Sequence, residues 1–186
     1  MKPSSATNIT IDDFKMAFEA TEHLIQNGCQ RIAHFAGSQK TSIYRDRLNG
    51  YLSALENHGL NKNDAIIIES RLKPTDGKRM AMELLEMSPR PDGVFSANDL
   101  AAISAIQVFH EHDIQIPSDI AIMGFSNEPL GAYTNPPLSS VNQNPYLMGK
   151  TAIESLLDQI ENKAMSDEKI EIISEMIIRK SSATKS

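Results

Sequence analysis

Two polar side chains, Asn98 and Asp99, stand side by side between an apolar run typical of a strand and a helical pattern that begins at Leu100. One interpretation is an N-cap, in which a side-chain oxygen accepts hydrogen bonds from the first free amides of the helix. The other is a ligand contact, because open α/β sheets bind ligands outside the carboxyl ends of their strands. An amide suits a ligand hydroxyl, since it offers both a donor and an acceptor.

A phosphate-binding loop is the first enzyme-like alternative, and it is disfavoured. The stretch AGSQKTS carries Lys40 and Thr41 at the last two positions of a Walker A loop. His34 and Gln39 occupy the two glycine positions of that motif. The backbone cradle for phosphate is therefore missing, and we expect no nucleotide site here.

Hydrolase and metal chemistry are also disfavoured. Ser126 follows a strand pattern as in a nucleophile elbow, but the second glycine of Gly-x-Ser-x-Gly is replaced by Glu128. His110 and His112 lie two apart on a predicted helix and do not share a face, so they make no metal pair. We expect no cofactor and no metal, and a small hydrolase built on Ser126 remains the least favoured function.

Composition excludes several further classes. The 186 residues, 40% of them hydrophobic, are enough for one sizeable globular domain. The net charge of −6 argues against a grip on a nucleic-acid backbone by these residues alone. The single Cys29 excludes an internal disulfide. No apolar run is long enough to span a membrane, and Met1–Asn8 lacks the apolar core of a signal peptide, so we expect a cytoplasmic protein.

Strand and helix patterns alternate along the chain. Strands are expected at 9–11, 31–36, 65–68 (fully buried), 94–95, 120–123 and 170–178, and helices at 12–27, 44–58, 76–87, 100–111 and 146–160. This alternation predicts an α/β fold with a doubly wound, mainly parallel sheet, helices on both faces and right-handed crossovers. The stretch between Pro129 and Val141 is expected to be an irregular loop.

Six motifs, in order, resemble the bacterial lactose/galactose-repressor family. They are ATEHLIQNGCQRIAHFAG, RDRLNGYLSALENHGL, PDGVFSANDLAAISAIQVF, IQIPSDIAIMGFSNEP, NPPLSSVNQNPYLMGKTAIESLL and EMIIRKSS. The match runs from about Asp12 to Ser182. In that family a helix-turn-helix headpiece binds an operator, and a two-lobed core resembling periplasmic sugar-binding proteins holds a small effector between its lobes.

The resemblance covers only the C-terminal part of such a core. It implies that residues 1–12 are a crossover remnant of the N-terminal lobe, and that 13–140 form the C-terminal lobe. Residues 141–165 would be a crossover and a helix of the N-terminal lobe, 166–182 a final strand segment and 183–186 a tail. The chain is therefore expected to be truncated, with the apolar face of helix 146–160 lacking its partner.

The resemblance also assigns an effector site. Asn98 matches the asparagine that hydrogen-bonds the effector, which leaves Asp99 as the helix N-cap. Arg47 matches the effector-binding arginine, and its fork of donors suits paired hydroxyls or a carboxylate. Arg45 and Arg47 are two apart on a helix, so only one of them can face the cleft.

Four further positions complete the expected site, and some depart from the family pattern. Phe125 could stack on an apolar sugar face or belong to the core. Ser126 stands where many relatives carry an aspartate, and Leu72 where some carry an aromatic residue. Gln143 lies where the chain crosses between lobes and would line the cleft. These departures leave a sugar possible and its identity open.

The expected function follows from the resemblance. The chain would be the effector-binding and dimerising portion of a transcription regulator, not an enzyme. It would bind a small molecule such as a sugar, form a homodimer, and reach operator DNA only through a headpiece that this sequence lacks. The alternative is a periplasmic sugar-binding protein of a transporter, with the same two-lobed core and no DNA partner.

Overall fold

The computed structural model describes residues 7–162 and 168–183 and divides into two compact units. The larger unit comprises residues 13–142 and 176–186, and the smaller unit comprises 1–12 and 143–175. The chain thus passes between the units three times. Parts of the expected segments fall on residues 1–6, 163–167 and 184–186, which lie outside the described residues.

The larger unit is built on a six-stranded sheet with the order β3-β2-β4-β5-β6-β8. Its strands are β2 (Ile32–Ala36), β3 (Ile66–Glu69), β4 (Gly93–Ser96), β5 (Ala121–Ser126), β6 (Ser139–Asn142) and β8 (Glu175–Ile177). Each neighbouring pair from β3 to β6 is parallel. Its helices are α1 (Asp13–Gln26), α2 (Ser42–Asn57), α3 (Pro74–Leu85) and α4 (Asp99–Glu111), with short 3-10 helices η1 (Lys62–Asp64), η2 (Pro129–Tyr133) and η3 (Lys180–Ser182).

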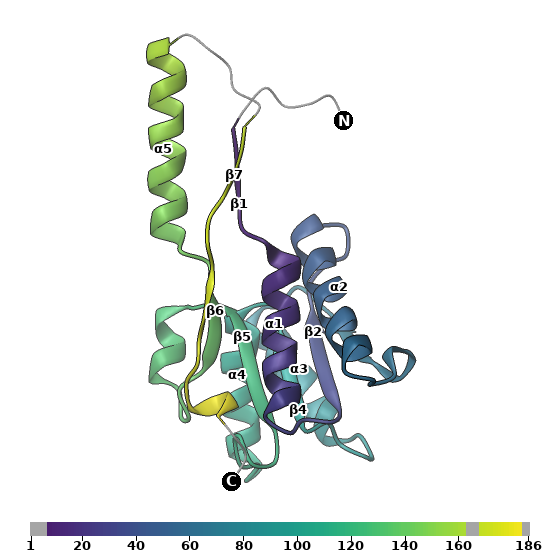
Figure 1. Cartoon of the computed structure of the whole chain (residues 1–186). Coiled ribbons are helices and arrows are strands. Elements are labelled where there is room, and N and C mark those ends of the chain that lie inside the picture. The colour runs from purple at the N-terminus through teal and green to yellow at the C-terminus, as the bar shows by residue number, and fades with distance from the viewer. Residues whose placement is uncertain (1–6, 163–167, 184–186) are drawn as a thin grey trace. The chain divides into compact units, whose positions relative to one another are not determined.

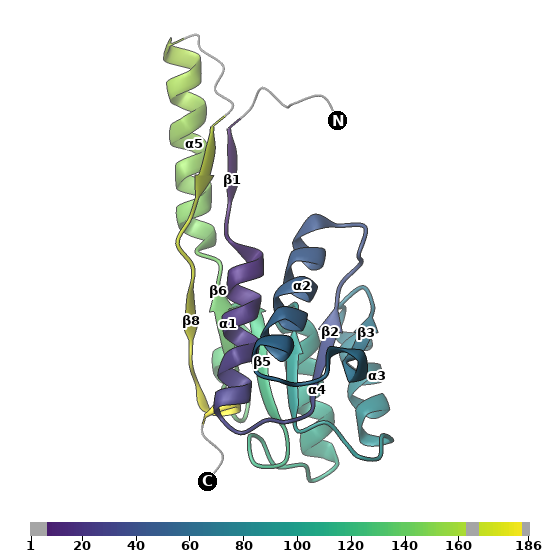
Figure 2. The ribbon, with the colours of Figure 1, turned by 45° about the vertical axis from the view of Figure 1, so that its right-hand side comes forward.

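The strand order places helices on both faces of this sheet. The connection from β2 to β3 moves outward in one direction, and the chain then returns past β2 and continues through β4, β5 and β6 in the other. Because parallel crossovers are right-handed, this reversal puts α2 on one face and α3 and α4 on the other. Figures 1 and 2 show α1 beside α2 in front of the sheet and α4 behind it. The predicted doubly wound α/β fold is confirmed.

Close helix packing closes the core on both faces. A side-chain carbon at Gly50 would overlap the carbonyl oxygen of Phe14, so α2 rests directly on α1. A side-chain carbon at Gly77 would overlap the carbonyl oxygen of Ala101, which joins α3 and α4 in the same way. The largest fully buried side chains of this core are Tyr51, Phe35, Phe95, Phe109, Phe125, Leu24, Met80, Leu84, Ile120, Ile122, Met123 and Leu138.

The smaller unit contains two short strands and one long helix. Strand β1 (Asn8–Thr10) pairs in parallel with β7 (Lys169–Glu171), and α5 (Pro145–Asn162) contacts β1. The large apolar side chains of α5 that are exposed are Tyr146, Leu147, Ile153, Leu156, Leu157 and Ile160. The exposed fraction reaches 61% at Ile153 and 63% at Ile160, so this helix buries little of its apolar surface.

Three expectations about secondary structure are wrong. The fully buried strand expected at 65–68 is the edge strand β3, of which only Ile68 is buried. The loop expected up to Val141 contains the strand β6. The single strand expected at 170–178 is two strands, because β7 pairs with β1 whereas β8 joins the sheet of the larger unit.

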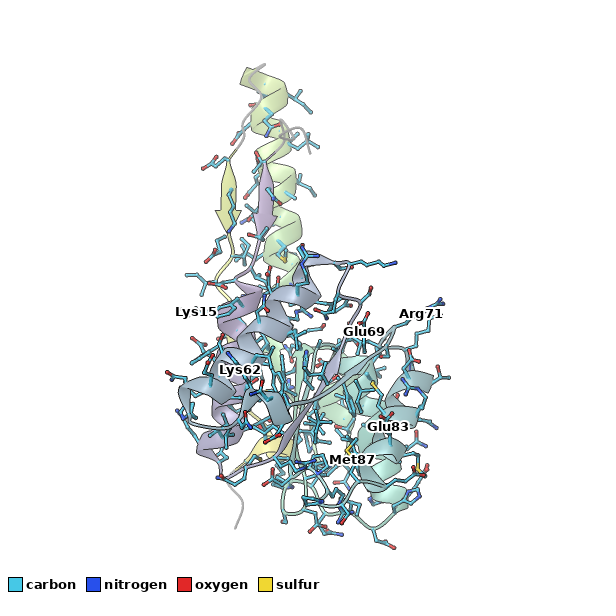
Figure 3. The ribbon with its side chains drawn as sticks, turned by 90° about the vertical axis from the view of Figure 1, so that its right-hand side faces the viewer. Lys15, Lys62, Glu69, Arg71, Glu83 and Met87 are labelled. Atoms are coloured by element: carbon cyan, nitrogen blue, oxygen red, sulfur yellow. The ribbon has the colours of Figure 1, made fainter. Side chains whose placement is uncertain are left out.

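Neighbouring residues of the larger unit can differ completely in exposure. In Figure 3 the side chain of Arg71 extends outward, whereas its neighbour Leu72 is buried in the core. Within the described residues, no helix is long and apolar enough to cross a membrane.

Candidate functional site

Arg47 occupies the carboxyl end of the sheet, beside the point where the strand order reverses. Its Nη1 donates a 2.7 Å hydrogen bond to the carbonyl oxygen of Ala97, the residue that follows β4. Its Nε donates to Asp13 Oδ1 at 2.8 Å, and its Nη2 lies 2.7 Å from the same oxygen. Ligands of open α/β sheets bind at such reversal points, so Arg47 is fixed where a ligand is expected.

The environment of Arg47 is built to hold a buried cation. The guanidinium carbon lies 3.6 Å from the centroid of the Phe125 ring, which is the geometry of a cation–π contact. Burial lowers the pKa of Arg47, and the charge and hydrogen bonds of Asp13 oppose that effect. Asp13 therefore stabilises the charge of the arginine. The guanidinium is also held rigidly, because Asp13 and Ala97 bond to its edge and Phe125 covers its face.

The helix cap expected of Asp99 is made by Asn98. Asn98 is the N-cap of α4, because its Oδ1 accepts hydrogen bonds from the amides of Leu100 (2.7 Å) and Ala101 (3.3 Å). Asp99 is instead fully buried, and it accepts hydrogen bonds from Ser140 Oγ at 2.7 Å and from the amide of Glu128 at 2.7 Å. Burial raises the pKa of Asp99, and these hydrogen bonds oppose the rise. The expectation that Asp99 caps the helix is wrong.

The cap uses the side-chain oxygen of Asn98 and leaves its side-chain nitrogen available to a ligand. Among the described residues, no hydrogen-bond partner is seen for its Nδ2. The residue is half-buried at the carboxyl end of β4, and its backbone is extended (φ −159°, ψ 143°). An N–H donor is therefore present for a ligand, while the acceptor of the same side chain serves the helix.

Ser126 and Asn127 form a strained loop after β5. Both have positive φ, 137° at Ser126 and 54° at Asn127, which L-residues rarely adopt. Both are half-buried. Within the described residues no histidine bonds to the Ser126 hydroxyl, so the base that a serine nucleophile requires is absent there.

Leu72, Phe125 and Gln143 are placed differently from the other expected site residues. Leu72 has φ 56° and packs in the apolar core of the larger unit with 3% of its surface exposed. Phe125 is fully buried, and the Arg47 guanidinium covers one face of its ring. Gln143 belongs to the smaller unit and is half-buried. The larger unit therefore brings Arg47 against Phe125 and beside Asn98, and Ser126 follows Phe125 at the end of β5.

His34 lies in the aromatic layer behind Arg47. Its ring stacks on Tyr51 (centroids 5.0 Å apart) and on Phe95 (4.9 Å), and its Nδ1 is 3.0 Å from the carbonyl oxygen of Phe95. Burial and, to a smaller extent, the charge of Arg47 lower the pKa of His34 to about 4, although the hydrogen bond to Phe95 partly offsets the burial. The ring is therefore neutral near pH 7.

Sequence reasoning missed three supporting residues of this region. Asp13 is absent from the expected site residues but forms the ion pair with Arg47. Ser140 lies in the strand that was expected to be a loop, and Arg179 lies in the motif EMIIRKSS, to which no site role was assigned. Asp13 is the first residue of α1, and its partner Arg47 lies on α2. The sequence around Asp13 therefore does not reveal the ion pair.

No metal centre accompanies these residues. Across residues 7–162 and 168–183, no group of three or more His, Cys, Asp or Glu side chains is placed to hold an ion. The contacts of this region are hydrogen bonds, a buried ion pair between Arg47 and Asp13, and cation–π contacts of Arg47 with Tyr44 and Phe125.

Comparison with known proteins decides the family. A family model described as a periplasmic binding protein-like domain matches residues 21–182. The chain belongs to this family. The periplasmic binding protein-like domain thus accounts for most of the larger unit and for α5 and β7 of the smaller one.

Relatives of this periplasmic binding protein-like domain are LacI-type regulators. The chain is 32% identical over 164 residues to the HTH-type transcriptional repressor PurR of Photobacterium profundum, covering 88% of this chain and 49% of the repressor. It is 32% identical over 184 residues to PurR of Haemophilus influenzae, covering 96% of this chain and 54% of that protein. The chain spans about half the length of the curated relatives it matches.

Solved structures agree. A LacI family transcriptional regulator from Enterococcus faecium with bound ribose superposes with a TM-score of 0.92 at 26% identity, covering 99% of this chain and 68% of the regulator. The transcriptional regulator CelR in complex with cellobiose gives a TM-score of 0.88 at 29% identity, covering 95% and 54%. The expected resemblance to the lactose/galactose-repressor family is confirmed.

Proposed function

We propose that this chain is the effector-binding portion of a LacI-type transcription regulator and that it is not an enzyme. The effector, a sugar or sugar-like small molecule, binds at the carboxyl end of the sheet in the larger unit. The observation that carries the proposal is the fixed Arg47 at that end, held by Asp13, Ala97 and Phe125. Structural neighbours that hold ribose and cellobiose support the choice of ligand class.

The chemistry of the site fits a ligand rich in oxygen acceptors. Each Nη of Arg47 carries a second hydrogen beyond those bonded to Asp13 and Ala97, and Asn98 offers its Nδ2. Ser126 adds a hydroxyl, which both donates and accepts. Gln143 of the smaller unit remains a proposed ligand residue. Phe125 supports Arg47, and Leu72 is given no direct contact because its side chain lies in the core.

Regulation requires parts beyond these residues. In the proposed protein the effector shifts an equilibrium between conformations by binding one of them more tightly, and a headpiece transmits the shift to operator DNA. We place this protein in the cytoplasm, where operator DNA lies. An in-frame helix-turn-helix upstream of the Met1 codon would support this assignment, whereas a secretory signal there would indicate the binding protein of a transporter.

A homodimer is part of the proposal. On the larger unit, η2 exposes Leu130 (64%) and Tyr133 (86%), and the contacting helix α4 exposes Leu100 (37%) at its start. Large apolar side chains grouped in this way are typical of protein–protein interfaces. Sedimentation velocity should show that Tyr133→Asp and Leu130→Asp shift the chain toward a monomer. A monomeric wild-type chain at micromolar concentration would contradict this part of the proposal.

Ligand binding is tested with two probes, D-ribose and cellobiose. Titration calorimetry and ¹⁵N chemical shifts should show binding to the wild-type chain and about tenfold or more weaker binding to Arg47→Lys, which loses the bidentate fork but keeps the charge beside Asp13. Arg45→Lys is the matched control, because the Arg45 side chain is exposed and donates to the Gln39 carbonyl oxygen, away from Asp13 and Ala97. Equal affinities in the three proteins would refute the assignment of Arg47.

A further inference from the structure

The loop that follows β5 needs something to hold it. Ser126 (φ 137°) and Asn127 (φ 54°) are consecutive residues in the left-handed region, and neither is glycine. Such a backbone persists only where surrounding contacts determine it. The contacts that do so here come from three distant parts of the chain.

Asp99 holds one end of the loop from the start of α4. Its fully buried carboxylate accepts a 2.7 Å hydrogen bond from the amide of Glu128 and bonds of 2.7 and 3.0 Å from Ser140 Oγ. The carboxylate lies so close to β5 that a side-chain carbon at Gly124 would overlap it. Only glycine at that position leaves room for this approach.

Ser140 and Arg179 hold the middle of the loop. Ser140 Oγ accepts a 2.9 Å hydrogen bond from the amide of Asn127. Arg179 donates from Nη2 to Asn127 Oδ1 at 2.8 Å and from Nη1 to the Leu138 carbonyl oxygen at 2.6 Å. The arginine is itself fixed, because its amide donates to Ser139 Oγ at 2.8 Å. Backbone and side chain of Asn127 are thus both tied down.

We propose that Asp99 and Arg179 are positioning residues of the effector site, which hold Ser126–Glu128 in its strained conformation so that Ser126 is presented beside Phe125 and Arg47. This inference rests on the proposed function. Neither residue has to touch the ligand. A preformed loop binds more tightly than a mobile one, because the ordering cost is met on folding and not on binding. This positioning role explains why the buried carboxylate of Asp99 and the half-buried Arg179 both bond to the same short loop.

Amide exchange measured by NMR tests the loop directly. In Arg179→Met the amides of Asn127 and Glu128 should exchange about tenfold or more faster than in the wild-type chain, while the β5 amide of Met123 stays unchanged. Arg79→Met is the matched control, because Arg79 is exposed and pairs with Glu83 on its own helix. Unchanged exchange at Asn127 and Glu128, or a loss of protection spread evenly over β5, would overturn the proposal.

Two further variants guard against misfolding. Asp99→Asn keeps an acceptor for the Glu128 amide and should increase exchange at that amide more than at Asn127. If Asp99→Asn does not fold, Arg179→Lys decides, since lysine keeps the charge but lacks the fork that bonds both Asn127 Oδ1 and the Leu138 carbonyl oxygen. Its Asn127 amide should exchange faster than that of the wild-type chain. An Arg179→Lys chain with wild-type exchange in the loop would overturn the proposal.

Titration with D-ribose separates this inference from the proposed function. If the wild-type chain binds ribose, Arg179→Met should bind about tenfold or more weakly with an unchanged melting temperature, and Arg79→Met should bind as the wild type does. Equal ribose affinity in Arg179→Met would overturn the positioning role. If the wild-type chain binds no ribose, the proposed function fails for that probe, and the exchange measurements alone decide the proposal about the loop.

Discussion

The two units of this chain treat their apolar residues differently. In the larger unit, α4 buries Ala101, Ala105 and Phe109 against the sheet and α3. In the smaller unit, α5 exposes more than half of Ile153 and Ile160. Both helices have amphipathic or apolar sequences. The apolar face of a helix stabilises a fold only when it packs against another apolar surface. The core of the larger unit offers such a surface to α4, whereas the apolar side chains of α5 stay exposed.

The largest expected contrast is in hydrogen exchange. Amides of α4 should exchange only on global unfolding, which costs about 5 kcal/mol or more in a stable domain, whereas α5 should open locally at little cost. We expect amides in the middle of α5 to exchange on the order of a thousandfold faster than those of α4. NMR-detected exchange on a dilute sample would measure this. Comparable protection in the two helices would show that α5 has a partner.

Side-chain truncation sharpens the same comparison. Phe109→Ala removes a fully buried ring of α4 and should lower the free energy of unfolding by about 3–5 kcal/mol. Ile153→Ala removes a side chain of α5 that is 61% exposed and should change it by less than about 0.5 kcal/mol. Urea denaturation followed by circular dichroism measures both. A large effect of Ile153→Ala would contradict the contrast.

The larger unit should also lose stability in acid through His34. Its folded pKa of about 4 lies below the ordinary histidine value of 6.5, so the unfolded state binds the proton more readily. The stability is complete above pH 6.5 and falls as the pH drops from 6.5 toward 4, by roughly 3 kcal/mol in total. The measurement is urea denaturation at intervals across this range.

His34→Gln is the control for that measurement, because glutamine does not titrate and can still donate to the Phe95 carbonyl oxygen. Its unfolding free energy should vary less with pH than that of the wild type between pH 6.5 and 4. Parallel curves for the two proteins would exclude His34 as the cause.

The smallest effect concerns the cap of α4. Asn98→Ala removes the acceptor of the Leu100 and Ala101 amides and should cost about 1 kcal/mol of stability. Asn98→Asp keeps the cap but replaces the Nδ2 donor, so it should keep the stability and lose affinity for the effector. Thermal denaturation and ligand titration of both variants separate the two roles. An Asn98→Asp chain with full affinity would remove Asn98 from the ligand site.

The helices and most strands of the larger unit could be predicted because their patterns are local. The apolar spacing and the terminal signals of α1, including Gly28 with φ 95°, were sufficient to place that helix. Strand β6 could not be predicted in the same way. Its Ser139 and Ser140 are polar, and they are buried because Arg179, Ser181 and Asp99 satisfy their hydroxyl and amide groups.

The position of the candidate residues was easier to predict than their contacts. Arg47 and Asn98 both lie at the carboxyl end of the sheet, where the family resemblance implies a ligand, and their contact with a ligand stays a prediction. That Asn98 and not Asp99 caps α4 could not be foreseen, because either side chain can cap a helix and only the position of Ser140 makes Asp99 the buried acceptor. Long-range partners such as Arg179 leave no trace in local spacing.

The last described residues of the larger unit complete its sheet. Ser181 is buried, donates to the Ile122 carbonyl oxygen at 2.7 Å and accepts from the Ser139 amide at 2.8 Å, while β8 covers the outer edge of β6. A nascent chain that has not yet delivered this segment from the ribosome presents β6 as a bare edge strand. Until this segment docks, the outer edge of β6 stays unpaired and open to pairing with another chain, so the segment protects the unit from association through that edge.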